Sequence, residues 1–212
     1  MKNNFILAVV LLFIFIFESC APTKATFNST TSPDLSSRKI SSIAIMPFSG
    51  LEADKTNLGR IDTTAMNAFD KKKINIKITG SYTANTKLDQ TLLNDWKSFS
   101  DDYNKGKNAD IKLTSQIGKD LKSDVIIQGK VSNIVQNNAS YGEKFGDTKI
   151  TLTINMFSAE TGKLLWTATS RGTVGTLTTN DPAPPVIDAV VAAVKEIFLN
   201  FPLKKSVNDY SK

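Results

Sequence analysis

The chain has 212 residues and a net charge of +6, from 26 basic and 20 acidic side chains, with one cysteine and no histidine. The lack of histidine excludes a Ser-His-Asp triad, a Cys-His pair and a histidine-ligated metal. A single cysteine excludes an intramolecular disulfide. With 41% hydrophobic and 22% charged residues, the composition is that of one folded domain of ordinary size. We expect no metal, no cofactor and no catalytic residues.

The N-terminus has the pattern of an export signal. Lys2 precedes an uninterrupted apolar run of 13 residues, from Phe5 to Phe17. A helix needs about 20 such residues to span a bilayer, so the run matches the apolar core of a secretory signal. The run leads into Cys20, the only cysteine of the chain.

The sequence Phe17-Glu18-Ser19-Cys20 resembles the lipobox of bacterial lipoproteins, in which a small residue precedes a cysteine that is lipidated and becomes the first residue of the mature chain. Ser19 and Cys20 fit this pattern, whereas Phe17 replaces the usual leucine and Glu18 is unusual. The resemblance implies removal of residues 1–19 and a bilayer contact through the acyl chains on Cys20. The alternatives are a plain cleaved signal, or an uncleaved anchor, with an incidental cysteine.

Three segments follow the signal. Residues 20–38 are rich in Ser, Thr, Pro and Asn and show no apolar periodicity, which predicts a flexible tether. Residues 39–203 are expected to form a single α/β domain, and residues 204–212 a polar tail. In enterobacterial lipoproteins an aspartate after the cysteine signals inner-membrane retention. Ala21 therefore favours the periplasmic side of the outer membrane.

Apolar periodicity predicts the elements of the domain in chain order. They are a strand over 40–48, a helix over 57–70 with Asn57 as its N-cap, a strand over 74–80, helices over 88–99 and 110–122, strands over 124–135, 149–157 and 164–170, and a helix over 185–200. This order favours an α/β (α+β) fold. We expect a mixed sheet of about five strands, with an early β-α-β crossover, a C-terminal β meander and covering helices that include a C-terminal one. Gly162 is expected to supply a positive φ in a turn, and Trp166 to lie in the core.

Three segments carry a family resemblance. Residues 43–48 form an apolar strand that ends in Pro-Phe, residues 117–131 join a helix to a strand, and residues 157–166 contain a Thr-Gly turn followed by Leu-Leu-Trp. Together they resemble the N-terminal domain of TolB and its relatives, the curli-secretion lipoprotein CsgG and the lipoprotein activators of penicillin-binding proteins. The resemblance implies a periplasmic domain that acts by binding and assembly. The loop 136–148 is too short and polar for the membrane hairpins of a curli-type channel.

The sequence offers one candidate contact loop and little sign of catalysis. Tyr141 and Phe145 lie between Gly and Asn residues at a predicted hairpin tip, where they have no evident core role, so we expect a partner-contact loop. The acidic candidates Asp101, Asp102, Glu143 and Asp147 lie in polar loops that contain lysines, which is typical of solvated surface. The basic residues come without any nucleic-acid-binding signature, so we expect no nucleic acid as partner.

The leading interpretation is a membrane-anchored periplasmic lipoprotein that acts as a non-catalytic protein-binding or envelope-assembly factor. Its partners would be the bilayer, through acylated Cys20, and an envelope protein. One alternative is a self-associating structural subunit, and hence a homo-oligomer. The other is an enzyme or sugar binder that acts on the cell wall.

Overall fold

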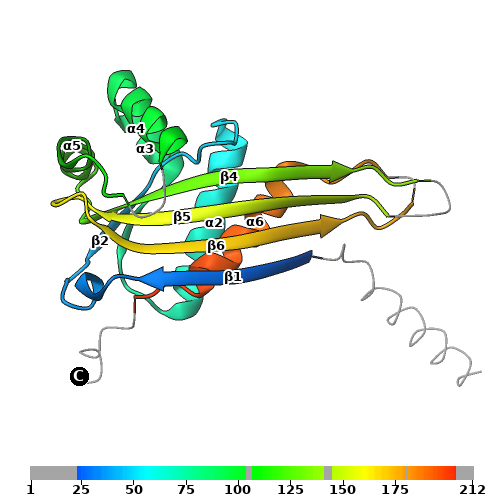
Figure 1. The fold of residues 1–212 in the computed structure, drawn as a ribbon, viewed down its shortest axis with the longest axis horizontal. Coiled ribbons are helices and arrows are strands. Elements are labelled where there is room, and N and C mark those ends of the chain that lie inside the picture. Colours follow the sequence, from blue (N-terminus) through cyan, green and yellow to red (C-terminus); the bar gives the residue numbers. More distant parts are fainter. Residues whose placement is uncertain (1–22, 104–106, 141–144, 180, 204–212) are drawn as a thin grey trace, which may run out of the picture.

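A computed structural model describes residues 23–103, 107–140, 145–179 and 181–203 (Figure 1). Phe17, Glu18, Ser19, Cys20 and the tail 204–212 lie outside this part of the chain. Among the described residues, the elements follow one another in this order: β1 (Thr23–Thr31), the 3-10 helix η1 (Pro33–Leu35), β2 (Ser42–Ile45), α2 (Lys55–Lys72), β3 (Lys77–Thr79), α3 (Ser81–Lys87), α4 (Gln90–Asp102), α5 (Ile111–Leu121), β4 (Val125–Asn137), β5 (Asp147–Ser158), β6 (Leu164–Gly175) and α6 (Val186–Leu199).

The strands form one mixed sheet with the order β1-β6-β5-β4-β2-β3. The β2-α2-β3 crossover is parallel, and β2 is also parallel to β4. The segments β4, β5 and β6 form an antiparallel meander. The predicted fold class, with its early crossover, C-terminal meander and C-terminal helix, is confirmed. The described sheet has one strand more than the five we expected, because β1 joins its edge.

The main correction concerns the expected tether over residues 20–38. Thr23–Thr31 forms β1, which pairs antiparallel with β6 from Thr23 opposite Val174 to Thr31 opposite Trp166. Only Ala25 and Phe27 are half-buried, and the other side chains of β1 are exposed. Main-chain hydrogen bonds to β6 therefore hold the strand, and its polar side chains give no apolar alternation that a sequence pattern could detect.

The main core lies between the sheet and the helices α2 and α6. An aromatic cluster joins them: the ring of Phe201 lies 5.0 Å from those of both Phe69 and Trp166, and Phe198 lies 5.3 Å from Phe69. Trp166 is buried, which confirms its predicted core position. Helix α6 also packs closely on β6, since a Cβ at Gly172 would lie 2.0 Å from the Ala189 carbonyl oxygen.

A second, smaller core lies on the opposite face of the sheet, at one end only (Figure 1). Helices α3, α4 and α5 cover it, and Trp96 and Phe157 lie at its centre, with ring centroids 6.5 Å apart. At this end the β5–β6 turn contains Gly162 with φ of +65°, as predicted. Most of β4, β5, β6 and β1 extends beyond these helices.

Helix α3 is absent from the predicted elements because its cap comes from another helix. Asp62 of α2 accepts hydrogen bonds from the backbone N of Ser81 (2.6 Å) and of Tyr82 (3.0 Å). The residue at the local N-cap position, Gly80, has no side chain to signal a helix start.

The predicted N-cap of α2, Asn57, is wrong. Asp54 is the N-cap instead, because its side chain accepts a hydrogen bond from the backbone N of Asn57 at 2.8 Å.

Candidate functional site

The predicted site residues divide between described and undescribed parts of the chain. Cys20 and the other lipobox residues lie outside the described residues, and so does Tyr141 of the expected contact loop. Phe145 of that loop lies just before β5 and is 60% exposed. The structure thus places Phe145 on the surface at the β4–β5 hairpin end, and the pairing of Phe145 with Tyr141 in one contact loop stays a prediction.

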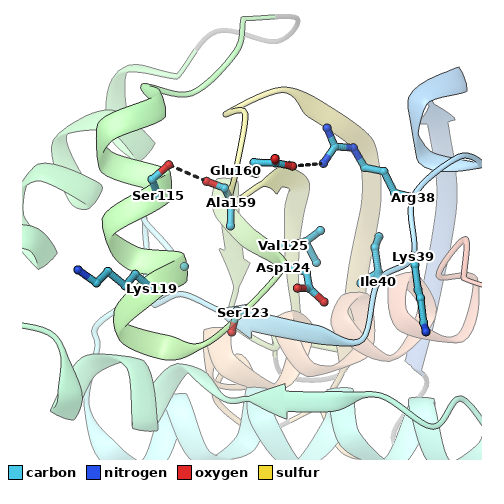
Figure 2. A pocket seen from close by; sticks show the side chains of 11 residues that line it. Arg38, Lys39, Ile40, Ser115, Lys119, Ser123, Asp124, Val125, Ala159 and Glu160 are labelled. Carbon is cyan, nitrogen blue, oxygen red and sulfur yellow. Dashed lines mark hydrogen bonds and ion pairs between the residues drawn. The ribbon is translucent and has the colours of Figure 1, made fainter.

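A pocket of about 500 Å³ lies at the other end of the sheet, between α5 and the connection from η1 to β2 (Figure 2). Arg38 points across it to Glu160, with 3.6 Å between guanidinium and carboxylate. Arg38 also donates to the Ser158 hydroxyl at 2.9 Å. On the α5 side, Ser115 donates to the backbone oxygen of Ala159 at 3.2 Å. The pocket therefore carries charged groups of both signs.

The second carboxylate in this pocket, Asp124, is held by structural hydrogen bonds. One oxygen accepts from the Ser41 backbone N (2.8 Å), the Ser41 hydroxyl (2.7 Å) and the Ser42 backbone N (3.0 Å). Partial burial alone would raise the pKa of Asp124, but the hydrogen bonds from Ser41 and Ser42 outweigh it and lower the pKa below its ordinary value. Asp124 therefore stays ionised and joins the start of β2 to the start of β4.

A buried chain of polar side chains crosses the sheet beneath α4. The Thr167 hydroxyl donates to Asn155 (2.6 Å), and the Asn155 amide donates to Gln128 (2.6 Å). Gln128 then donates to the Ser100 hydroxyl (2.7 Å), which donates to Ser49 (3.2 Å). Because each buried member has a partner, the chain attaches α4 to the sheet without an unsatisfied polar group among these side chains.

Beyond this chain the sheet presents a surface that no described helix covers. Along β6, Ala168, Ser170, Gly172 and Val174 are buried on the α6 side, whereas Thr167, Thr169, Arg171 and Thr173 alternate with them and are half-buried or exposed. Figure 1 shows α6 behind these strands and α3–α5 gathered near one end. We call this surface the open face. Its residues lie in three cross-strand rows: Lys24, Thr173, Lys149 and Val135; Thr26, Arg171, Thr151 and Ser132; and Asn28, Thr169, Thr153 and Lys130.

The three rows of the open face are rich in hydroxyl groups and positive charge, and none of their residues is acidic. Asp147 lies beside the first row, two residues before Lys149 on the same side of β5. Arg171 is exposed and lies opposite Thr26 on one side and Thr151 on the other. The nearest carboxylate along β5, Asp147, pairs with Lys149 and also accepts from Asn137 at 2.7 Å. The hydrogen bond from Lys149 lowers the pKa of Asp147, and the one from Asn137 lowers it further. Partial burial acts in the opposite direction but is outweighed. The face therefore carries net positive charge at neutral pH.

β1 is the terminal strand of the described sheet, beside the open face. Its nine residues include no proline, no bulge and only one charged residue, Lys24. Natural edges usually carry such features, because they prevent pairing with another chain. A terminal strand without such features can accept an extended segment through main-chain hydrogen bonds.

Within the part of the chain that the structure describes, no helix combines the length and the apolar character that crossing a membrane requires. Nor do any three acidic side chains there lie together in a way that could hold a metal ion.

No protein-family profile and no curated protein matches this chain. Among solved structures it is similar to a PelC dodecamer from Paraburkholderia phytofirmans, with 11% identity, coverage of 83% of this chain and 96% of that chain, and a TM-score of 0.47. It is also similar to lipoprotein GNA1162 from Neisseria meningitidis, with 14% identity, coverage of 76% and 99%, and a TM-score of 0.39. These values describe a coarse likeness in the arrangement of strands and helices.

Proposed function

We propose that this chain is a lipid-anchored, non-catalytic binding protein of the bacterial cell envelope. It faces the periplasm from the outer membrane and holds an acidic partner protein on its open face. The observation that carries the proposal is the open face itself, three rows of hydroxyl groups and cations that contain no acidic residue. The carboxylate beside them, Asp147, is already paired with Lys149. Its location follows from the lipobox resemblance at Cys20.

The roles of the carboxylates favour binding over catalysis. A general acid or base must reach a substrate with a free oxygen or proton. Asp124 is held by Ser41 and Ser42, and Asp147 by Lys149 and Asn137. Asp62 is buried and caps α3. Each therefore has a structural partner that explains its position.

Arg171 is the group around which the acidic partner would dock. Its guanidinium can bind a carboxylate through two parallel hydrogen bonds, and hydroxyls of Thr26 and Thr151 lie on the neighbouring strands to accept or donate. Complementary charge of this kind raises association rate and selectivity more than affinity. The adjoining edge of β1 can add affinity through main-chain hydrogen bonds.

Site-specific photo-crosslinking in intact cells tests this proposal. A photo-reactive residue at Thr169, on the open face, is expected to capture an envelope protein that the same residue at Thr63, exposed on α2, does not capture. Arg171→Glu should abolish the capture, whereas Lys112→Glu, a matched charge reversal on the exposed side of α5, should leave it unchanged. Capture that is unaffected by Arg171→Glu would contradict the proposal.

Self-association is the second candidate function, and the unprotected edge of β1 favours it. Two copies can pair along β1 and extend the sheet across the contact. In the crosslinking experiment, this function predicts that the captured protein is a second copy of this chain. Native mass measured at decreasing concentration distinguishes self-association from binding of a different envelope protein, because a stable assembly of copies persists on dilution.

A further inference from the structure

Apolar side chains are exposed at the hairpin end of the sheet. Among the described residues, seven large hydrophobic side chains are well exposed, and four of these lie at this end, with exposed fractions of 45% to 60%: Ile134, Val135, Phe145 and Leu177. The other three lie on three different helices, one each on α2, α3 and α5: Met66, Tyr82 and Ile111. A local concentration of this kind marks an interaction surface.

The four side chains come from three neighbouring segments that the backbone brings together. The backbone N of Gly146 donates to the Thr176 hydroxyl at 2.9 Å, and the backbone N of Thr176 donates to the Gly146 oxygen at 2.8 Å. Phe145 and Leu177 are the chain neighbours of this bonded pair. Val135 lies on the adjacent strand, opposite Lys149. We call the set Ile134, Val135, Phe145 and Leu177 the apolar end.

The described residue nearest to Cys20 in the sequence, Thr23, lies at the same end of the sheet. Thr23, the first residue of β1, lies opposite Val174, near the end of β6. Only three residue steps separate Thr23 from Cys20, a reach of at most about 11 Å. An acylated Cys20 would therefore hold this end of the sheet next to the bilayer. The opposite end, with the β5–β6 turn at Glu160, lies about 40 Å away along the 12 residues of β5.

Positive charges lie directly behind the apolar end. Lys24 and Lys149 belong to the first row of the open face, which also contains Val135. Lys149 is paired with Asp147, so a lipid phosphate would compete with that carboxylate for its ammonium group, whereas Lys24 is exposed. A bilayer surface favours apolar side chains at the tip of a protein and lysines one layer farther from the membrane. The apolar groups then enter the boundary of the acyl chains, and the ammonium groups stay among the phosphates.

We infer that the apolar end docks on the bilayer that holds acylated Cys20, with Phe145 and Leu177 in the interfacial layer and Lys24 and Lys149 at anionic lipid headgroups. This inference rests on the acylation in the proposed function, and it assigns Phe145 to lipid rather than to a protein. A second membrane contact makes anchoring firmer than acyl chains alone. It also makes the strands rise from the membrane. The second and third rows of the open face, with Arg171, then stand clear of the bilayer for a partner, while the first row faces the headgroups.

A fluorescence experiment on the full lipidated chain tests this docking. Because Cys20 is the only cysteine and would be blocked by acylation, Phe145→Cys provides a unique thiol for an environment-sensitive fluorophore. The labelled chain is reconstituted in vesicles of phosphatidylethanolamine and phosphatidylglycerol, with and without brominated acyl chains. Glu160→Cys, at the opposite end, is the matched control, with a side chain that is 82% exposed. Leu177→Cys is a second probe, in case the first variant folds poorly.

The inference predicts blue-shifted emission at positions 145 and 177 and quenching by brominated lipid at least threefold stronger than at position 160. Lys24→Glu combined with Lys149→Glu should weaken that quenching in the anionic vesicles. Equal, water-like emission at positions 145 and 160 on an acylated chain would overturn the docking and return the loop to a protein contact. The intact mass of the same sample reports acylation of Cys20 separately, so a failure of the proposed anchor is told apart from a failure of docking.

Discussion

Gly172 of β6 lies directly against the backbone of Ala189 in α6, so close that a Cβ at position 172 would stand 2.0 Å from the Ala189 carbonyl oxygen. No rotation of a side chain can relieve that contact, because both partners are backbone or Cβ. The close approach lets α6 bury the apolar side of β5 and β6, and it leaves the other side of these strands as the open face.

Gly172→Ala should therefore destabilise the domain. We expect a loss of about 1–3 kcal/mol in the free energy of unfolding, the usual cost of forcing extra volume into a packed core, measured by urea denaturation. Gly59→Ala is the matched control, because a Cβ at Gly59 in α2 meets open space. That variant should be equally stable or up to about 1 kcal/mol more stable. Equal losses in both variants would contradict the close packing of α6 on β6.

Asn155→Ala should break the buried polar chain beneath α4. It leaves the Gln128 amide oxygen and the Thr167 hydroxyl without their partner, and an unsatisfied buried polar group costs about 1–3 kcal/mol. Thr153→Ala, two residues away on the same face of β5 but only half-buried, should change the unfolding free energy by no more than about 0.5 kcal/mol. Similar urea midpoints for the two variants would show that the polar chain does not stabilise the fold.

The stability should depend on pH through Asp124. Its folded-state pKa is lowered, so its ionised form stabilises the folded chain above the ordinary carboxyl pKa of about 3.9. That stabilisation is lost as the pH falls through the lowered folded-state pKa. Asp124→Asn should thus be less stable than the wild type at pH 7, and the difference should shrink toward pH 2. Ser41→Ala, which removes one hydroxyl donor, should reduce the pH-dependent difference. A difference that stays constant between pH 7 and pH 2 would contradict this account.

β1 should behave as a strand in solution. Backbone amides of Thr23–Thr31 that donate to β6 are expected to exchange with solvent deuterium more slowly than those of an unstructured peptide. Phe27→Ser removes the aromatic side chain through which β1 contacts the main core, so it should speed exchange across the strand. Exchange of all amides in residues 23–31 at the unstructured rate would support the tether that the sequence predicts.

The sequence predicts the interior elements well, because their signal is local. The alternation of Ile150, Leu152 and Ile154 indicates a strand with one buried face, and the structure buries all three. The predicted set of strands lacks β1, because polar side chains on a strand held by main-chain hydrogen bonds give no periodic pattern. Helix α3 is missed for a related reason, since its cap, Asp62, is 19 residues away in the sequence.

The open face and the apolar end depend on register, which composition does not reveal. The hydroxyl-rich stretches of β1, β5 and β6 are visible in the sequence, but only the pairing of Thr26, Arg171 and Thr151 shows that they form one surface. The sequence does indicate Phe145 as a surface residue. It does not indicate that Leu177, more than thirty residues later, lies near it.

Acylation of Cys20 is the point on which the proposed location depends, and the intact mass of the chain extracted from the membrane fraction tests it most directly. We predict a chain that begins at Cys20 and carries added acyl mass on that residue, with no thiol that reacts after unfolding. Cys20→Ser should lose the acyl mass. A membrane-extracted chain with a free Cys20 thiol, whether it retains residues 1–19 or not, would contradict the lipid-anchored account.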